Sequence, residues 1–466
     1  MLTPKNRRIR LAAVLLAGIT GIGALAGCSG RGGAQGWKAS EEEMKKAEEA
    51  YAETRFSVGC WIPPRIHQMP DDESALARLQ ELKDSGINFI ATHHGDLGDM
   101  DFIFRVLNAA EKTGIDVIIE LNTDLSKSGI NWNLNVVKRT VDYPALAGYN
   151  LYDEPGDAGF AALTREFEAV KELVRDKGKV VYMNLLPNYG PMENMAPVVT
   201  EGLTPYRTYL DNALKTGTEI LSFDFYPYSS GGNDESSICR MLENLSDMAV
   251  MAKKYGVSCA GFLQNSSWPG MREPEATELR FLSSIHLAFG FKSYSYFLYA
   301  EPYKDSGFNG MLTWEGETTP QYKRVRANNA EISGYKGRFL NYDLDGFYTD
   351  RLEGSYGDFI APELKRSIKN DAFLKSFDAE FSVLTGVFGP RLSLAPDGAD
   401  DSAPAAYFIL NFDSWNRNTV TLNFRTSTPY TVWTSDGIVA MGSGSSVSFP
   451  VAESGFAFVE LTAGEK

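Results

Sequence analysis

Apolar and polar residues alternate in two different patterns along the chain, and the first pattern covers residues 56 to about 340. Short continuous apolar runs are typical of buried strands, whereas apolar residues three and four positions apart are typical of amphipathic helices. The predicted strands are residues 56–62, 87–92, 116–121, 147–152, 180–186, 220–226, 258–263 and 293–299. The predicted helices are residues 75–85, 100–112, 134–141, 161–175, 206–215, 237–255, 275–288 and 321–335.

This alternation predicts a (β/α)₈ TIM barrel over residues 56–340. Such barrels usually contain about 250 residues, which suits eight strand–helix units in this stretch. Several predicted helices end at a glycine, the residue that best accepts a left-handed backbone: Gly86, Gly114, Gly178, Gly217, Gly256 and Gly290. A doubly wound open sheet is the rival fold, but no glycine-rich dinucleotide fingerprint follows the first predicted strand, so the barrel is favoured.

The second pattern begins near residue 376. From there the apolar residues no longer have helical spacing, and short strand-forming runs are separated by turn residues. The predicted strands are residues 406–411, 419–424, 430–434, 446–450 and 455–461. We therefore expect a small C-terminal antiparallel β-sandwich domain over residues 376–466, joined to the barrel by a mixed connection at residues 341–375.

The N-terminus has the order of a secretory signal, with a basic start before an uncharged apolar run at residues 11–26. This run is shorter than the roughly 20 residues that a membrane-spanning helix needs. It ends in Leu25-Ala26-Gly27-Cys28, which resembles the bacterial lipobox and implies diacylation of Cys28. An ordinary signal peptide with an incidental cysteine is the alternative. We expect a signal peptide at 1–27, a tether and short helix at 28–55, and a cell-envelope location with the membrane reached through lipid on Cys28.

Composition narrows the possible partners. The net charge of −15 argues against nucleic acid, because phosphate binding needs clustered Lys and Arg. The four His and four Cys residues show no metal-ligand spacing, so we expect neither a metal nor an organic cofactor. Cys60 and Cys259 fall inside predicted strands, which favours buried free thiols.

Carboxylates, amides and aromatic rings follow the predicted strands, at the end of the barrel where such folds place their chemistry. Sugars need both kinds of partner, since aromatic faces pack on C–H surfaces while carboxylates and amides bond to hydroxyls. The expected substrate-binding residues are Asp153, His94, Asn184, Tyr226, Tyr228, Gln264, Trp268 and Glu301. Tyr226, Tyr228 and Trp268 are candidate sugar platforms, and His94 either lines the site or is satisfied in the core.

The sharpest motif is Tyr152-Asp153-Glu154-Pro155, at the end of the fourth predicted strand. It resembles the Asn-Glu-Pro ending in the large clan of retaining glycoside hydrolases. Residues 56–340 also resemble family-42-like, beta-galactosidase-type barrels, through Gly148-Tyr149-Asn150-Leu151, Asn184-Leu185-Leu186-Pro187-Asn188-Tyr189, Asp224-Phe225-Tyr226-Pro227-Tyr228 and Thr319-Pro320-Gln321-Tyr322. The resemblance implies a glycoside hydrolase with Glu154 as general acid/base. That role needs a raised pKa, to which repulsion from Asp153 can contribute.

The chain departs from the clan at the seventh predicted strand, where the clan's nucleophilic Glu is replaced by Gln264. An amide is not a nucleophile, so we expect Gln264 to bind hydroxyls. Asp224 is the first choice for the second catalytic carboxylate, at the roughly 6.5–9.5 Å separation of inverting enzymes, and Glu301 and Glu120 are alternatives.

Two functions remain open at this point. The first is an envelope-anchored glycoside hydrolase that cleaves a poly- or oligosaccharide. The second is a catalytically inactive carbohydrate-binding lipoprotein on the same barrel. A purely structural envelope protein is least favoured, because it has no need of a polar and aromatic rim.

Overall fold

The computed structural model describes residues 36–391 and 405–461. The signal peptide, most of the tether and Cys28 lie outside the described residues, so the lipid anchor stays a prediction. No helix in the described ranges is both long and apolar enough to cross a membrane. The chain divides into two compact units. The barrel unit is Ser57–His286 and Phe291–Asn329, and the β unit is the described residues up to Phe56, Leu287–Gly290 and those from Ala330 onward.

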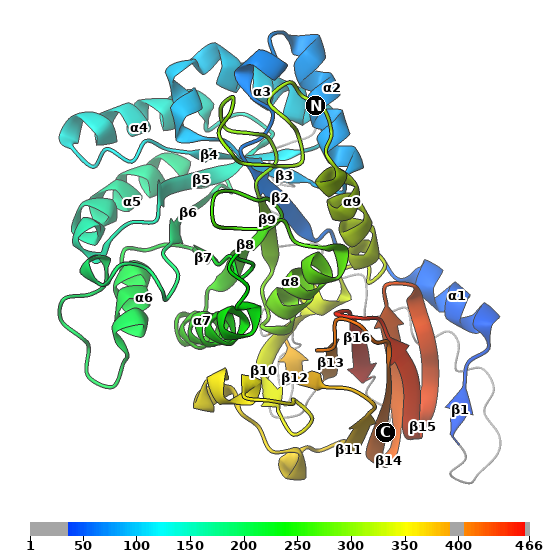
Figure 1. Ribbon diagram of the computed structural model, residues 1–466. Helices are drawn as coiled ribbons and strands as arrows, with labels where there is room; N and C mark the ends of the chain where they lie inside the picture. The colour runs from blue at the N-terminus through cyan, green and yellow to red at the C-terminus, as the bar shows by residue number, and fades with distance from the viewer. Residues whose placement is uncertain (1–35, 392–404, 462–466) are drawn as a thin grey trace. The chain divides into compact units, whose positions relative to one another are not determined.

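The barrel unit contains a closed barrel of eight parallel strands, shown in Figure 1. In order around the barrel they are β2 (Ser57–Trp61), β3 (Phe89–Ala91), β4 (Asp116–Glu120), β5 (Leu146–Asp153), β6 (Val180–Leu185), β7 (Ile220–Asp224), β8 (Ser258–Gln264) and β9 (Ser293–Phe297). The barrel closes because β9 pairs in parallel with β2. Every strand overlaps the run predicted for it, so the (β/α)₈ barrel is confirmed.

A helix follows each barrel strand: α2 (Asp72–Asp84), α3 (Met100–Thr113), α4 (Lys127–Thr140), α5 (Phe160–Val174), α6 (Pro205–Lys215), α7 (Asp234–Tyr255), α8 (Ala276–Ala288) and α9 (Pro320–Ser333). Gly114 and Gly256 end α3 and α7 in the left-handed conformation, as predicted. The helix predicted at 134–141 begins earlier, at Lys127, because the Ser126 side chain caps a polar first turn by accepting a hydrogen bond from Gly129 N–H.

The β unit is built on antiparallel strands that run β1 (Trp37–Lys38), β15 (Gly437–Val451), β14 (Asn418–Thr434), β16 (Phe456–Leu461), β13 (Ala406–Asn411), β12 (Val383–Pro390) and β10 (Tyr342–Tyr348). Strand β11 (Leu374–Ala379) pairs with β14 outside this path. Strands β10 to β16 all contribute side chains to one buried apolar cluster, which is the shared core that a sandwich requires. The predicted antiparallel β-domain is therefore confirmed.

Some boundaries in the β unit differ from the sequence prediction. Residues 419–424 and 430–434 belong to the single strand β14, whose pairing with β15 shifts register between Asn423 and Thr428. Strand β10 lies inside residues 341–375 and pairs with β12. The short N-terminal helix is α1 (Glu41–Ala50), which begins with a capping box between Ser40 and Glu43.

Short 3₁₀ turns complete the described chain at Ile66–Gln68, His94–Gly98, Asp157–Gly159, Met192–Asn194, Arg338–Asn341, Tyr356–Phe359, Pro362–Leu364 and Ile368–Asn370. Cys60, Cys239 and Cys259 are buried, and none of the three forms a disulfide bond within the described residues.

Candidate active site

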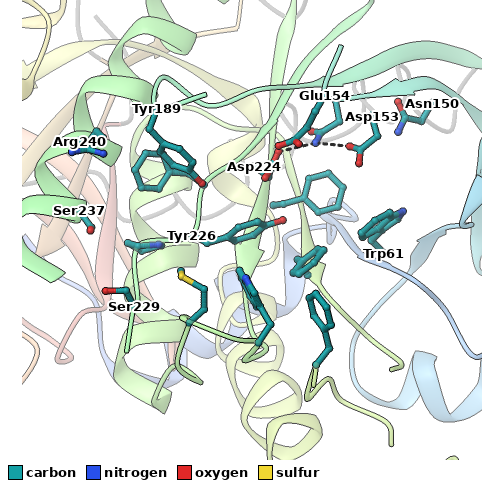
Figure 2. Close-up of a pocket in the computed structure, with 18 of the residues that line it drawn as sticks. Trp61, Asn150, Asp153, Glu154, Tyr189, Asp224, Tyr226, Ser229, Ser237 and Arg240 are labelled. Atoms are coloured by element: carbon teal, nitrogen blue, oxygen red, sulfur yellow. Dashed lines mark hydrogen bonds between the residues drawn. The ribbon is translucent and has the colours of Figure 1, made fainter. Parts of the chain in front are cut away.

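A cavity of about 660 Å³ lies at the C-terminal ends of the barrel strands. Its polar lining includes the last residues of three strands, Glu120 of β4, Asp153 of β5 and Asp224 of β7. Glu154 follows Asp153, and aromatic rings form much of the remaining wall. Figure 2 shows the three labelled acids Asp153, Glu154 and Asp224 gathered on one side of the cavity. The described residues include no group of three or more His, Cys, Asp and Glu side chains arranged to hold a metal ion.

Asn184, on β6, joins two of these acids. Its Nδ2 donates hydrogen bonds to Asp153 Oδ1 at 3.1 Å and to Asp224 Oδ1 at 3.0 Å. Its Oδ1 accepts a hydrogen bond from Ser222 Oγ at 2.9 Å, which fixes the orientation of the amide. Asn184 lies in the cavity as predicted, but both of its N–H donors are used by carboxylates, so its main effect is to position Asp153 and Asp224.

Glu154 has an unusual backbone conformation. Its φ is 52°, in the left-handed region that non-glycine residues seldom adopt and that is enriched at active sites. Its N–H donates a 2.9 Å hydrogen bond to Asn184 O, which holds the turn. The turn brings the Glu154 carboxyl to Asp224, and the two side chains are hydrogen-bonded.

Two carboxyl groups in direct contact share a proton, because both cannot be ionised at such a distance. Burial raises the pKa of Glu154, and the hydrogen bond from Asp224 partly offsets this. Burial, followed by the charges of Glu154 and Asp153, raises the pKa of Asp224 well above its usual range. The wide separation expected for Glu154 and Asp224 is therefore wrong, since the left-handed turn at Glu154 directs its side chain across β6 to β7.

Asp153 has a strongly raised pKa. Burial, then the negative charges of Glu120 and Glu154, raise its pKa to about 7, against the lowering effects of Asn184 and His94. The expected repulsion between Asp153 and Glu154 is present, and it contributes to the raised pKa of Asp153.

Glu120 is held by two donors. Its Oε2 accepts a 2.6 Å hydrogen bond from Trp61 Nε1, and its Oε1 lies 2.6 Å from His94 Nδ1. The hydrogen bond to Glu120 is the largest cause that raises the pKa of His94. His93 stacks on His94 with ring centroids 4.3 Å apart, and burial lowers the pKa of His93 to about 4. His94 therefore reaches the site through Glu120, which it orients.

Another part of the cavity wall is a cluster of aromatic rings. Trp61 stacks on Phe297 at 5.4 Å between centroids, and Trp268 meets Tyr226 and Phe297 edge-to-face, each at 5.2 Å. Phe308 stacks on Trp268 at 5.9 Å. Each ring is held by the next, so the wall offers rigid flat surfaces of the kind that pack against sugar rings. Tyr226 and Trp268 lie where the sequence placed them as sugar platforms.

Besides His94, three more predicted site residues lie outside the cavity lining. Gln264 is fully buried, with Oε1 accepting from Tyr228 N at 3.0 Å and Nε2 donating to the carbonyls of Tyr228 and Arg272 at 2.9 and 2.8 Å. Its amide ties together the loops after β7 and β8, so the prediction that it binds hydroxyls is wrong. Tyr228 is only 2% exposed and packs against the Arg272 guanidinium. Glu301 instead accepts a hydrogen bond from Trp314 N at 3.2 Å.

The cavity also contains residues that the sequence analysis did not assign to the site, although it named Asn150 and Tyr189 in the resemblance: Trp61, Asn150, Tyr189, Arg240, Phe297 and Phe308. Trp61 and Phe297 end barrel strands, so the rule that chemistry gathers at strand ends contained a signal for them. Tyr189 comes from the loop after β6 and Arg240 from helix α7. The rule concerns the ends of strands, so it predicts neither residue.

Comparisons with known proteins identify the fold. No protein-family model and no curated protein matches the sequence. A glycoside hydrolase family 5 structure from Bacteroides vulgatus is similar over 88% of this chain and 90% of that one, with a TM-score of 0.54 and 9% identity. A beta-galactosidase from Marinomonas ef1 has a TM-score of 0.46 and 10% identity. The similar region covers 61% of this chain and 62% of the beta-galactosidase chain. A putative alpha-L-fucosidase from Bacteroides thetaiotaomicron has a TM-score of 0.42 and 13% identity, over 60% and 97% of the two chains.

These structural neighbours are glycoside hydrolases, and the family 5 structure shares the barrel followed by a β-domain. At such low identity the likeness extends to the fold and does not identify a substrate or an activity.

Proposed function

We propose that the protein hydrolyses glycosidic bonds in the barrel cavity. The observation that carries this proposal is the hydrogen-bonded pair of Glu154 and Asp224, whose pKa values are both raised, in a cavity that aromatic rings also line. Cleavage of a glycosidic bond needs a proton on the leaving oxygen, and a carboxyl group with a raised pKa supplies it near neutral pH. The glycoside-hydrolase fold supports the same class of chemistry.

The proposed reaction transfers the glycosyl group from the leaving oxygen to water. Glu154, recharged by the proton it shares with Asp224, protonates the glycosidic oxygen as the bond from that oxygen to the anomeric carbon breaks. Glu120, oriented by Trp61 and His94, provides negative charge near the developing positive charge. Water adds to the anomeric carbon, and Asp153, with a pKa of about 7, accepts its proton and later returns it through solvent.

A covalent glycosyl intermediate on the seventh barrel strand is not part of this proposal. Strand β8 ends in Gln264, whose amide is buried and hydrogen-bonded to backbone groups. The same observation favours the second candidate function, a carbohydrate-binding protein without hydrolysis. Binding of a glycan by a wild-type protein that never cleaves it would support this second function.

The deciding experiment measures turnover of aryl glycosides and of plant and host glycans by wild type and Glu154→Gln. We expect the substitution to reduce turnover by about a hundredfold or more, because it removes the transferable proton and keeps the shape of the side chain. Glu168→Gln, on the exposed face of α5, is the matched control and retains full activity. Equal turnover by wild type and Glu154→Gln contradicts the proposed role of Glu154.

A further inference from the structure

Arg240 introduces positive charge into a cavity that is otherwise acidic. It is the sole Lys or Arg among the described residues that line the cavity, whereas Glu120, Asp153, Glu154 and Asp224 are all lining acids. In Figure 2 Arg240 lies with Ser237, Ser229 and Tyr189 on the side away from the labelled acids. The cavity therefore has one acidic end and one end that carries a cation.

The guanidinium of Arg240 has no carboxylate partner in the described part of the chain, and its charge partly offsets the raised pKa that burial gives the Tyr189 hydroxyl. It forms no ion pair or side-chain hydrogen bond there, although its backbone carbonyl accepts one from Asn188 Nδ2. By contrast, Arg272 of the same unit pairs with Asp234 and Glu278, each at 2.6 Å. An arginine that fixes a loop usually has such carboxylate partners. An unpaired arginine on a cavity wall keeps its donors available for a ligand.

Two hydroxyl groups accompany the guanidinium. Ser237 precedes Arg240 by three positions on α7, so the two side chains share one face of the helix. Ser229, in the loop after β7, also lines the cavity. A planar guanidinium with neighbouring hydroxyl donors matches the oxygens of a carboxylate or a sulfate, which accept two parallel hydrogen bonds from arginine.

We infer that Arg240, Ser237 and Ser229 form a subsite for the anionic group of an acidic sugar, a uronic-acid carboxylate or a sulfate ester. This inference rests on the proposed function of the cavity as a glycan site and names the substrate class. The acidic end of the cavity repels the same anion, so the two ends together determine which way the glycan lies. The cleaved bond then lies at Glu154 and the anionic residue lies toward α7.

The experiment measures binding by calorimetry in the Glu154→Gln background, so that no turnover is needed. The probes are oligouronides, their methyl esters, neutral oligosaccharides of the same linkage, and sulfated counterparts. We expect an acidic probe to bind about tenfold more tightly than its neutral match at low salt, with the preference falling as salt rises. The carboxylate and sulfate probes distinguish the two anions.

Arg240→Gln in the same background removes the preference for the acidic probe and leaves the affinity for the neutral probe within about twofold. Arg326→Gln is the matched control, since Arg326 is an exposed arginine on α9 outside the cavity lining, and it keeps the preference. Equal binding of acidic and neutral probes overturns the inference and leaves the proposed function standing. Failure of every probe to bind overturns the inference and removes support for the glycan site itself.

Discussion

Asp153 links the chemistry of the cavity to the stability of the fold. In the folded protein its pKa is about 7, raised first by burial, whereas an unfolded Asp releases its proton near pH 4. Between these two values the folded state holds a proton that the unfolded state has lost. The contribution of this group is therefore fully present below about pH 4, and it is lost as the pH rises through the folded pKa.

We expect Asp153→Asn to remove this pH dependence, because an amide does not ionise. The melting temperature of the variant, relative to wild type, should increase between about pH 4 and pH 8, by roughly 2–4 °C for each kcal/mol that wild type loses over this range. Scanning calorimetry at intervals of one pH unit measures the difference. The exposed Glu168→Gln control should follow wild type throughout, and parallel curves for Asp153→Asn and wild type would contradict the assignment.

At the residue scale, the motif Tyr152-Asp153-Glu154-Pro155 predicted the position of the site more accurately than the other candidate residues did. Asp153 and Glu154 both lie in the cavity, and their position at the end of the fourth strand was visible in the chain. The sequence analysis named Asp224 as the second carboxylate but placed it too far from Glu154. The contact between the two depends on the left-handed turn at Glu154, which the sequence did not predict. Gln264 likewise has a side chain that could bind hydroxyl groups, but its amide is already hydrogen-bonded to the Tyr228 backbone.

At the element scale the placement of these acids depends on the close packing of β5 against β6. A Cβ built on Gly148 would lie 2.2 Å from the carbonyl oxygen of Val180, so no side chain fits between the strands. Farther along the same pair of strands, Asp153 lies opposite Asn184. If a side chain at residue 148 pushed β5 away from β6, we would therefore expect the carboxyl groups of the site to move as well.

Gly148→Ala should lower the free energy of unfolding by about 1–3 kcal/mol, the usual cost of overpacking a dense interior. It should also reduce turnover, because β5 carries Asp153 and leads into Glu154. Urea denaturation and the glycosidase assay measure the two effects. Gly98→Ala is the control, because an added Cβ there meets nothing within 4 Å. Unchanged stability in Gly148→Ala would show that the strands separate at little cost.

The predicted elements were most accurate where hydrophobic spacing acts locally. The eight barrel strands and their helices follow from that spacing, since each strand must bury its side chains in the barrel. The beginning of α4 was missed because its first turn is polar and is specified by the Ser126 cap instead of an apolar face. Strand β14 was divided in two because its register shift near residue 423 resembles a turn in the sequence.

At the scale of the whole molecule, the β unit has its own buried polar centre. Glu460, 3% exposed, accepts hydrogen bonds of 2.8 Å from Arg338 Nη2, Tyr342 Oη and Trp433 Nε1. These residues come from β16, β10, β14 and the turn before β10, so one carboxylate joins distant parts of the unit. Removing its charge would leave the Arg338 guanidinium largely buried without a counter-charge.

Glu460→Gln should therefore destabilise the β unit by about 3–5 kcal/mol, the usual range for breaking a buried ion pair. Scanning calorimetry is the measurement, and turnover assayed below the transition should remain unchanged because Glu460 does not line the cavity. Glu380→Gln, at an exposed position of the same unit, should leave the transition in place. An unaltered transition in Glu460→Gln would mean that the pair contributes little net stability.

The sequence by itself determined the barrel, the antiparallel β-domain and the acidic and aromatic character of the strand ends. These features depend on periodicity and on the shared direction of parallel strands, both of which are local or topological properties. Only the tertiary structure decided that Glu154 contacts Asp224, that Gln264 is withdrawn from the cavity, and that Arg240 of α7 lies opposite the acids. Those outcomes depend on turns and loops far apart in the chain, whose side-chain contacts form only after the barrel has closed.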